Sequence, residues 1–250
     1  MRKKSIIILL LIGIFLFNGC SCSKEDLINE NTLLKEENML LENENSKYRG
    51  VEDIFSFYNK ITSDSLNSFV LVESSKSSGT IKYSDGVVIA KEGYYYYVLT
   101  DYYCIYQTAN SPYQSITYKV MDKNATVYNA EVSTIYDVEG GLLLLRVSTL
   151  GHTNVGMKSI QLGEKSDLVA HVSSLEHINK IQMSEKIKTS TIEHNDASYN
   201  VYNIEDIIVN SGALLNVNNE LCGLYLYNYN GFIETNLIKN IVNFIYQPIL

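Results

Sequence analysis

The chain has no tryptophan and only two prolines, four histidines and four cysteines among its 250 residues. The scarcity of proline, together with twenty tyrosines and many isoleucines and valines, favours extended strands over helices. The few histidines and cysteines show no spacing typical of a ligand set, so the sequence predicts neither a metal site nor a cofactor. With 46% hydrophobic residues the chain can bury a full core, and we expect a globular, mainly β protein.

Positive charge is also scarce. Lysine and arginine number 20 against 28 aspartates and glutamates, which gives a formal net charge of −8. Three of the positive charges stand at the extreme N-terminus, within a stretch that we expect to be removed. Because duplex binding depends on basic side chains that neutralise phosphates, we expect no nucleic-acid partner.

A short apolar run opens the chain. Arg2, Lys3 and Lys4 precede an apolar stretch at 6–17, and about twelve residues are too few to span a bilayer but typical of a secretory signal. The run ends at Gly19-Cys20 and there resembles a bacterial lipoprotein signal. That resemblance implies removal of residues 1–19 and diacylation of Cys20, which anchors the chain to the bacterial cell membrane. The alternative is an uncleaved anchor, and both readings place the body outside the cytoplasm.

Residues 20–50 predict a helical, coiled-coil stalk. Leucine and asparagine each recur there every seven residues, at Leu27, Leu34 and Leu41 and at Asn31, Asn38 and Asn45. Leucine at d and asparagine at a can set the register of a parallel homodimer. The alternative is a solvated single helix that holds the body off the membrane.

The rest of the chain reads as a short helix with its lead-in, 51–66, followed by a β domain, 67–250. Strand-like runs recur at roughly ten-residue spacing, with turn signals at 91–93 and 122–124, and "GGLLLLRV" indicates a strand buried on both faces. We expect two small barrels, at about 67–150 and 151–235, and a terminal helix at about 235–246.

Four stretches, in order, resemble a trypsin-like serine peptidase of the HtrA/Deg type. They are "SDGVVIAKEGYYYYVLTDYYCI", "YKVMDKNATVYNAEVSTIYDVEGGLLLLRV", "VNSGALLNVNNELCGLY" and "GFIETNLIKNIVN". The first corresponds to the segment that ends T-N-x-H-V in the family, the second to D-L-A-L-L-R-V and the third to G-N-S-G-G-P-L. The resemblance covers about 180 residues, from Ser68 onward, and implies two six-stranded chymotrypsin/trypsin-like β-barrels with a C-terminal helix.

The same resemblance implies a degenerate catalytic site. Ser211 matches the nucleophile, but Tyr103 stands at the position of the histidine base and Gly141 at that of the aspartate. Tyrosine titrates near pH 10, so Tyr103 cannot accept the serine proton at neutral pH. Val209 replaces the glycine whose N–H helps to bind the oxyanion, and its β-branched side chain disfavours that geometry.

No other group is expected to replace the missing base. We expect none of the four histidines to come within reach of the serine segment, and each to be a surface or loop residue: His152, His171, His177 and His194. Asp137 and Glu139 precede the aspartate position but lack a histidine relay, and Cys104 has no basic neighbour to activate it. A disulfide between Cys104 and Cys222 is left open. We therefore expect no proton acceptor beside the Ser211 hydroxyl.

These observations lead to a hypothesis of function. We expect a catalytically inactive pseudopeptidase on a membrane-anchored lipoprotein, acting as a peptide-binding, protein-binding or regulatory module in the cell envelope. The resemblance implies that an extended peptide binds by strand addition in the cleft between the barrels, near the tyrosines at 94–97. Two alternatives stay open: an active serine endopeptidase with rearranged machinery that uses Ser211, and a structural coiled-coil spacer with an inert head.

Overall fold

The computed structural model of the chain describes residues 31–36, 38–39, 54–76, 79, 81–102, 116–133, 141–174, 180–194 and 197–239. The chain divides into two compact units, Met1–Phe55 and Ser56–Leu250. In the first unit, residues 31–36 and 38–39 are helical and exposed. The other residues of the expected stalk, together with Cys20 and the signal, lie outside the described residues. Of the helices that are described, none has both the length and the apolar character needed to cross a bilayer.

A helical segment leads into the β structure of the second unit. The α-helical turns at 54–60 continue as a π-helix, η1 (Ile61–Ser65), and a 3₁₀ turn, η2 (Leu66–Ser68). Phe57 and Ile61 are buried against the core, because the one-face spacing of these apolar residues matches the helical period. Within the range 51–66, where a short helix with its lead-in is predicted, the described residues 54–66 are helical.

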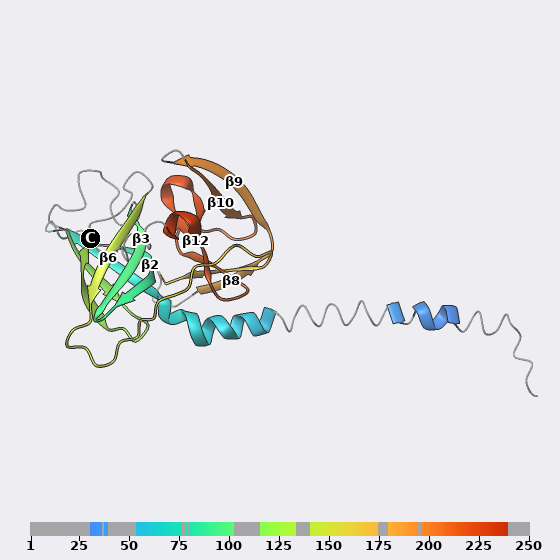
Figure 1. Ribbon diagram of the computed structural model, residues 1–250, viewed down its shortest axis with the longest axis horizontal. Helices are drawn as coiled ribbons and strands as arrows, with labels where there is room; N and C mark the ends of the chain where they lie inside the picture. Colours follow the sequence, from blue (N-terminus) through green and yellow to red (C-terminus); the bar gives the residue numbers. More distant parts are fainter. Residues whose placement is uncertain are drawn as a thin grey trace, which may run out of the picture. The chain divides into compact units, whose positions relative to one another are not determined.

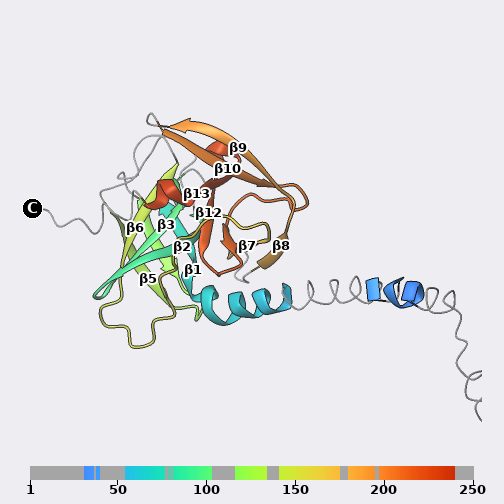
Figure 2. The same cartoon turned by 45° about the vertical axis from the view of Figure 1, so that its right-hand side comes forward.

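Six antiparallel strands then form a closed barrel with the order β1-β2-β3-β6-β5-β4. Figure 2 labels five of them: β1, β2, β3, β5 and β6. The strands are β1 (Phe69–Lys76), β2 (Ile81–Glu92), β3 (Tyr95–Asp101), β4 (Ile116–Met121), β5 (Val127–Val132) and β6 (Leu142–Ser148). Four consecutive leucines make β6 buried on both faces, as predicted, because one face lines the barrel and the other faces the second sheet.

Seven further strands form a second sheet, with the order β8-β7-β11-β12-β13-β10-β9. Its strands are β7 (Val169–Ser173), β8 (Lys180–Ser184), β9 (Ile187–His194), β10 (Ala197–Ile204), β11 (Ala213–Asn216), β12 (Leu221–Leu226) and β13 (Gly231–Glu234), and a 3₁₀ turn, η3 (Tyr227–Tyr229), joins the last two. Figure 1 shows β2, β3 and β6 of the barrel on one side and β8, β9, β10 and β12 of the sheet on the other.

The sheet repeats the pairing scheme of the barrel. Its two edge strands, β8 and β9, are consecutive in the chain and only Glu185 and Lys186 separate them. When β8 and β9 are counted as halves of one strand, each pairing in the sheet has its counterpart in the barrel. The two halves of the β domain therefore share one topology.

The expectation of a second closed six-stranded barrel is not met by these strands. The described residues of 151–235 form a seven-stranded sheet in which β8 and β9 are not paired with each other. The stretch predicted as one strand, "KIQMSEKIKTSTI", is divided at Ser184. The Ser184 hydroxyl accepts the Lys186 N–H and donates to the Asp206 carboxylate, so side-chain bonds replace ladder bonds at the division.

One apolar cluster joins the two halves. It contains Val87, Leu99 and Leu144 from the barrel and Leu215 and Ile233 from the sheet. The terminal helix is described at 235–239, where Leu237 and Ile238 pack into the same cluster, and its expected remainder lies outside the described residues. A shared core of this kind fixes the barrel against the sheet, so loops of the two can form a common site.

Candidate functional site

Ser211 lies in the connection between β10 and β11. Gly212 follows it with φ of +100°, a conformation that favours glycine, and the chain turns sharply there into β11. Side chains alternate before the turn: Ile207 and Val209 pack against a buried cluster while Ile208 is 99% exposed. Ser211 itself is 4% exposed, so its hydroxyl faces the interior.

The buried partner of Ser211 is Asp85, on β2 of the barrel. The Ser211 hydroxyl donates to Oδ2 of Asp85 over 2.6 Å, and the Ser173 hydroxyl donates to the same oxygen over 2.8 Å. The backbone N–H of Ser174 donates to Oδ1. Asp85 is 4% exposed. One carboxylate of the barrel therefore accepts three hydrogen bonds from the second half of the β domain, two from the end of β7 and one from the connection between β10 and β11.

The sequence prediction of no proton acceptor beside Ser211 is wrong, because Asp85 lies within hydrogen-bonding distance. Reasoning from catalytic motifs missed it, since the resemblance assigns no role to this position. The sequence nevertheless contains a signal: Asp85 is an acidic residue in "KYSDGVVIA", a stretch whose apolar end is typical of a buried strand. A buried aspartate in such a run needs hydrogen-bond donors from another segment.

Burial raises the pKa of the Asp85 carboxyl above its usual value of 3.8. The hydrogen bonds from Ser211, Ser174 and Ser173 act in the opposite direction, as does the nearby imidazole of His171, because each stabilises the ionised form. Removal from water is the largest of these effects.

His171, on β7, also reaches the serine segment, which corrects the expectation that it would be a surface or loop residue out of reach. Its Nε2 lies 2.9 Å from the Ser211 carbonyl oxygen, and it is 4% exposed. Because a carbonyl oxygen only accepts, Nε2 carries the hydrogen in this contact and cannot take the proton of the hydroxyl. Burial lowers the pKa of the imidazole. His171 therefore orients the backbone at Ser211 and leaves the hydroxyl to Asp85.

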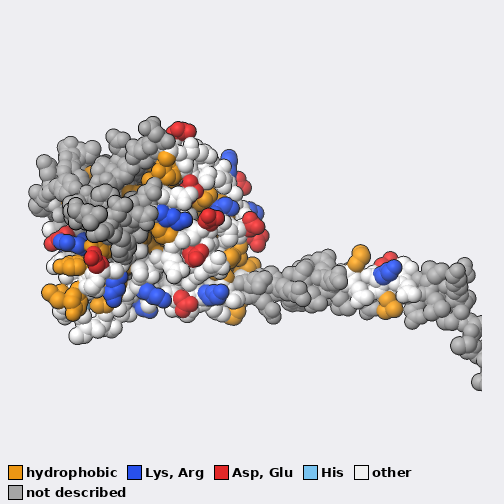
Figure 3. Space-filling model, viewed as in Figure 1, with side chains coloured by type: hydrophobic (Ala, Val, Ile, Leu, Met, Phe, Trp, Pro, Cys, Tyr) orange, Lys and Arg blue, Asp and Glu red, His pale blue; other side chains and the backbone are white. Residues whose placement is uncertain are grey.

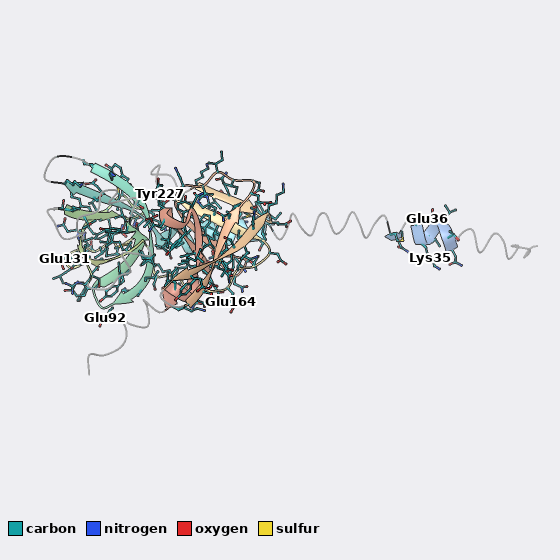
Figure 4. All side chains as sticks on the ribbon, turned by 90° about the horizontal axis from the view of Figure 1, so that it is seen from above. Lys35, Glu36, Glu92, Glu131, Glu164 and Tyr227 are labelled. Carbon is teal, nitrogen blue, oxygen red and sulfur yellow. The ribbon has the colours of Figure 1, made fainter. Side chains whose placement is uncertain are left out.

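A second aspartate makes a parallel contact. Asp101, the last residue of β3, is 4% exposed and accepts the N–H of Tyr227 over 2.5 Å. The register of β2 and β3 ends with Gly86 opposite Thr100, so Asp85 and Asp101 are the next residues along the two strands. Tyr227, labelled in Figure 4, lies where the barrel meets the sheet. Two neighbouring carboxylates of the barrel thus hold two loops of the sheet.

The other predicted site positions are described only in part. Tyr103, Cys104, Asp137, Glu139 and His177 lie outside the described residues. Gly141 has φ of +80°, and its carbonyl accepts the Tyr102 N–H just after β3. Val209 is half-buried.

The other described histidines, His152 and His194, and the cysteine on β12 lie elsewhere in the β domain. His152 is exposed and packs on the Tyr128 ring at 4.6 Å. His194 lies at the end of β9. Cys222 is a buried free thiol whose Sγ–H donates to the Leu214 carbonyl, and burial raises its pKa to about 12. Within the described ranges, no cluster of three histidines, cysteines or acidic residues could hold a metal ion.

The site therefore contains a buried serine hydroxyl that is hydrogen-bonded to a buried carboxylate. Figure 3 shows acidic and basic side chains interspersed on the visible face of the β domain. No protein-family model and no curated protein matches the sequence.

Proposed function

We propose that residues 67–250 are a catalytically inactive, trypsin-like pseudopeptidase that binds an extended peptide or an envelope protein, held at the membrane through lipidated Cys20. The topology supports a trypsin-like reading, because one strand-pairing scheme occurs twice in succession. The closed barrel is compatible with the first barrel of that family.

The burial of the Ser211 hydroxyl carries the proposal of inactivity. A nucleophile must come within about 3–3.5 Å of the carbon that it attacks. The hydroxyl of Ser211, 4% exposed, instead donates to Asp85, whose two oxygens already accept two further hydrogen bonds. The pair has the form of a structural contact that fixes the loop.

Exposed aromatic residues support a binding role. Tyr94 and Tyr95 are 65% and 41% exposed at the β2–β3 turn, whereas Tyr96 and Tyr97 are buried. The Arg146 guanidinium lies 5.0 Å from the centre of the Tyr95 ring. Tyrosine and arginine together are typical of surfaces that bind proteins or peptides.

The contact with Asp85 also favours a second candidate, an active serine endopeptidase with rearranged machinery. A carboxylate 2.6 Å from a serine hydroxyl can accept its proton, and the raised pKa of Asp85 makes it a stronger base than an exposed aspartate. In this candidate, opening of the contact between barrel and sheet would admit the substrate.

Labelling with a fluorophosphonate probe separates the two candidates. We expect the purified full chain to show no labelling above that of Ser211→Ala, because the hydroxyl is buried and its proton is held. Ser190→Ala, at an exposed serine on β9, is the matched control. Labelling that is lost in Ser211→Ala and in Asp85→Asn but kept in Ser190→Ala would establish the endopeptidase candidate and overturn inactivity.

A further inference from the structure

A small pocket lies at the junction of the barrel and the sheet, next to the contact of Asp85. Its volume is about 130 Å³, and it is lined by Phe69 and Leu71 of β1, Met121 of β4, the turn residues Asp122, Lys123 and Ala125, and Ser174 of the sheet. A cavity of about 150 Å³ can hold one benzene molecule, so this pocket has room for one aliphatic side chain. Four of these lining residues are apolar, and Lys123 is exposed.

The turn that forms the wall of the pocket is held rigidly. The Asp122 carboxylate accepts the N–H groups of Asn124, Thr126 and Gly156 and the Tyr128 hydroxyl. Ala125 has φ of +58°, which is strained for a residue with a Cβ. Backbone strain of this kind persists only where the surroundings enforce it, and it is frequent at binding sites. The pocket is therefore formed before any ligand arrives.

The charges around the pocket determine what it can accept. Both oxygens of Asp122 already receive two hydrogen bonds each, from Asn124 and Thr126 on one oxygen and from Tyr128 and Gly156 on the other, so this carboxylate is saturated as an acceptor. Lys123 is the basic residue among those that line the pocket, and it is exposed, so it can pair with a charged group of a ligand. An apolar side chain beside an acidic group complements this combination.

We propose that this pocket anchors an extended peptide by one aliphatic side chain, with an acidic group of the peptide against Lys123. The inference rests on the proposed function, since it names the anchor of the peptide that the pseudopeptidase binds. Ser174 connects the pocket with the contact between Ser211 and Asp85, because Ser174 lines the pocket and its backbone N–H donates to Asp85. The bound peptide thus lies beside the segment that contacts Ser211 through Asp85.

The methionine methyl groups provide a local readout. With the full chain labelled at the ¹³C methyl of methionine, we expect the tetrapeptide acetyl-Gly-Leu-Glu-Gly-amide to shift the Met121 signal. Met157, buried in the barrel core, should stay unchanged. The analogue with serine in place of leucine should bind about tenfold more weakly, because the apolar burial is lost.

A charge exchange tests the role of Lys123. We expect Lys123→Glu to weaken binding of the acidic peptide roughly threefold and to improve binding of the analogue with lysine in place of glutamate. Lys119→Glu is the matched control, since Lys119 lies on β4, the strand that leads into the turn, pairs with Glu73 and does not line the pocket. Equal shifts of Met121 and Met157, no shift of Met121, or equal effects of the two lysine variants would overturn the proposal.

The outcome is independent of the test for inactivity. A missing Met121 shift with no Ser211-dependent labelling would remove this pocket and leave the pseudopeptidase. Ser211-dependent labelling with a specific Met121 shift would remove the pseudopeptidase and leave the pocket as an anchor for substrate.

Discussion

The barrel and the sheet share one pairing scheme but differ in closure. In the barrel, β2 runs without a break through twelve residues and pairs with β1 on one side and β3 on the other. In the sheet, the strand in the same topological position is divided into β8, which pairs with β7, and β9, which pairs with β10. The division of this one strand at Ser184 coincides with the difference between the closed six-stranded barrel and the open seven-stranded sheet.

The two halves also differ in the contacts that stabilise them. The barrel interior is packed closely around valines, whereas the sheet depends on the barrel for part of its core and for the carboxylates of Asp85 and Asp101. A closed barrel has no free edges and can stabilise itself. The sheet should therefore be the more sensitive half when the contacts between them are removed.

The largest expected effect is that of Asp85→Ala, which removes the acceptor of three buried donors. We expect the free energy of unfolding to fall by about 2–4 kcal/mol, less than the sum of three bonds because the variant avoids burying a carboxylate. Amide hydrogen exchange should increase more in the sheet, at 197–239, than in the barrel, at 116–133. Urea denaturation and exchange mass spectrometry measure both quantities.

Ser211→Ala is the matched variant, since it removes one donor and leaves the other two in place. It should cost about 1 kcal/mol. An Asp85→Ala variant as stable as Ser211→Ala, or one that loosens the barrel first, would contradict the dependence of the sheet on this contact.

Smaller effects are expected from alanine substitutions at two glycines, one in the barrel and one in the sheet. These substitutions report how tightly each half is packed. A Cβ at Gly86, inside the barrel, would meet the methyl groups of Val72 and Val98 at 2.7 Å, and valine methyls cannot turn aside easily. A Cβ at Gly223, in the sheet, would meet Phe232 at 3.1 Å. Gly86→Ala should cost about 1–3 kcal/mol and Gly223→Ala less than about 1 kcal/mol. Thermal unfolding of the two variants checks this, and equal losses would show that the sheet is packed as tightly as the barrel.

Local patterns predicted the strands well and the site poorly. The buried strand of four leucines and the two hairpin turns follow from local rules of periodicity and turn chemistry. The structure confirms the strand and the turn within 122–124, and it places the first turn at 93–94 because β2 continues through Glu92. The division at Ser184 depends on its bond to Asp206, which is distant in sequence and not visible in a local pattern. Similarly, Asp85 and Ser211 are separated by 126 positions. The resemblance assigns catalytic roles to Ser211, Tyr103 and Gly141. The hydrogen-bond partner of Ser211 is Asp85 on β2, a position to which the resemblance assigns no role.

The smallest expected effect concerns pH and compares the two buried titratable groups of the site. Burial raises the folded-state pKa of Asp85 above 3.8, so its contribution to stability is present below that value and is lost as pH rises through the folded-state pKa. Burial lowers the folded-state pKa of His171 below 6.5, so stability is lost as pH falls from 6.5 through the folded-state pKa. The Lys180 charge acts in the same direction on His171, whereas Asp85, the Ser211 carbonyl and Gln182 oppose it.

Variants at the two groups should therefore change the pH dependence of unfolding in opposite directions. We expect His171→Gln to reduce the loss of stability between about pH 7 and pH 5, because the unfolded state no longer gains a proton there that the folded state resists. Asp85→Asn should remove the gain in stability that protonation of Asp85 provides as pH falls through its folded-state pKa, so stability should fall more steeply with acidification. His152→Gln, at an exposed histidine, is the matched control and should leave the profile as it is. Urea unfolding at a series of pH values measures the profile, and a slope unaffected by His171→Gln would mean that the imidazole takes up its proton as readily in the folded protein as in the unfolded chain.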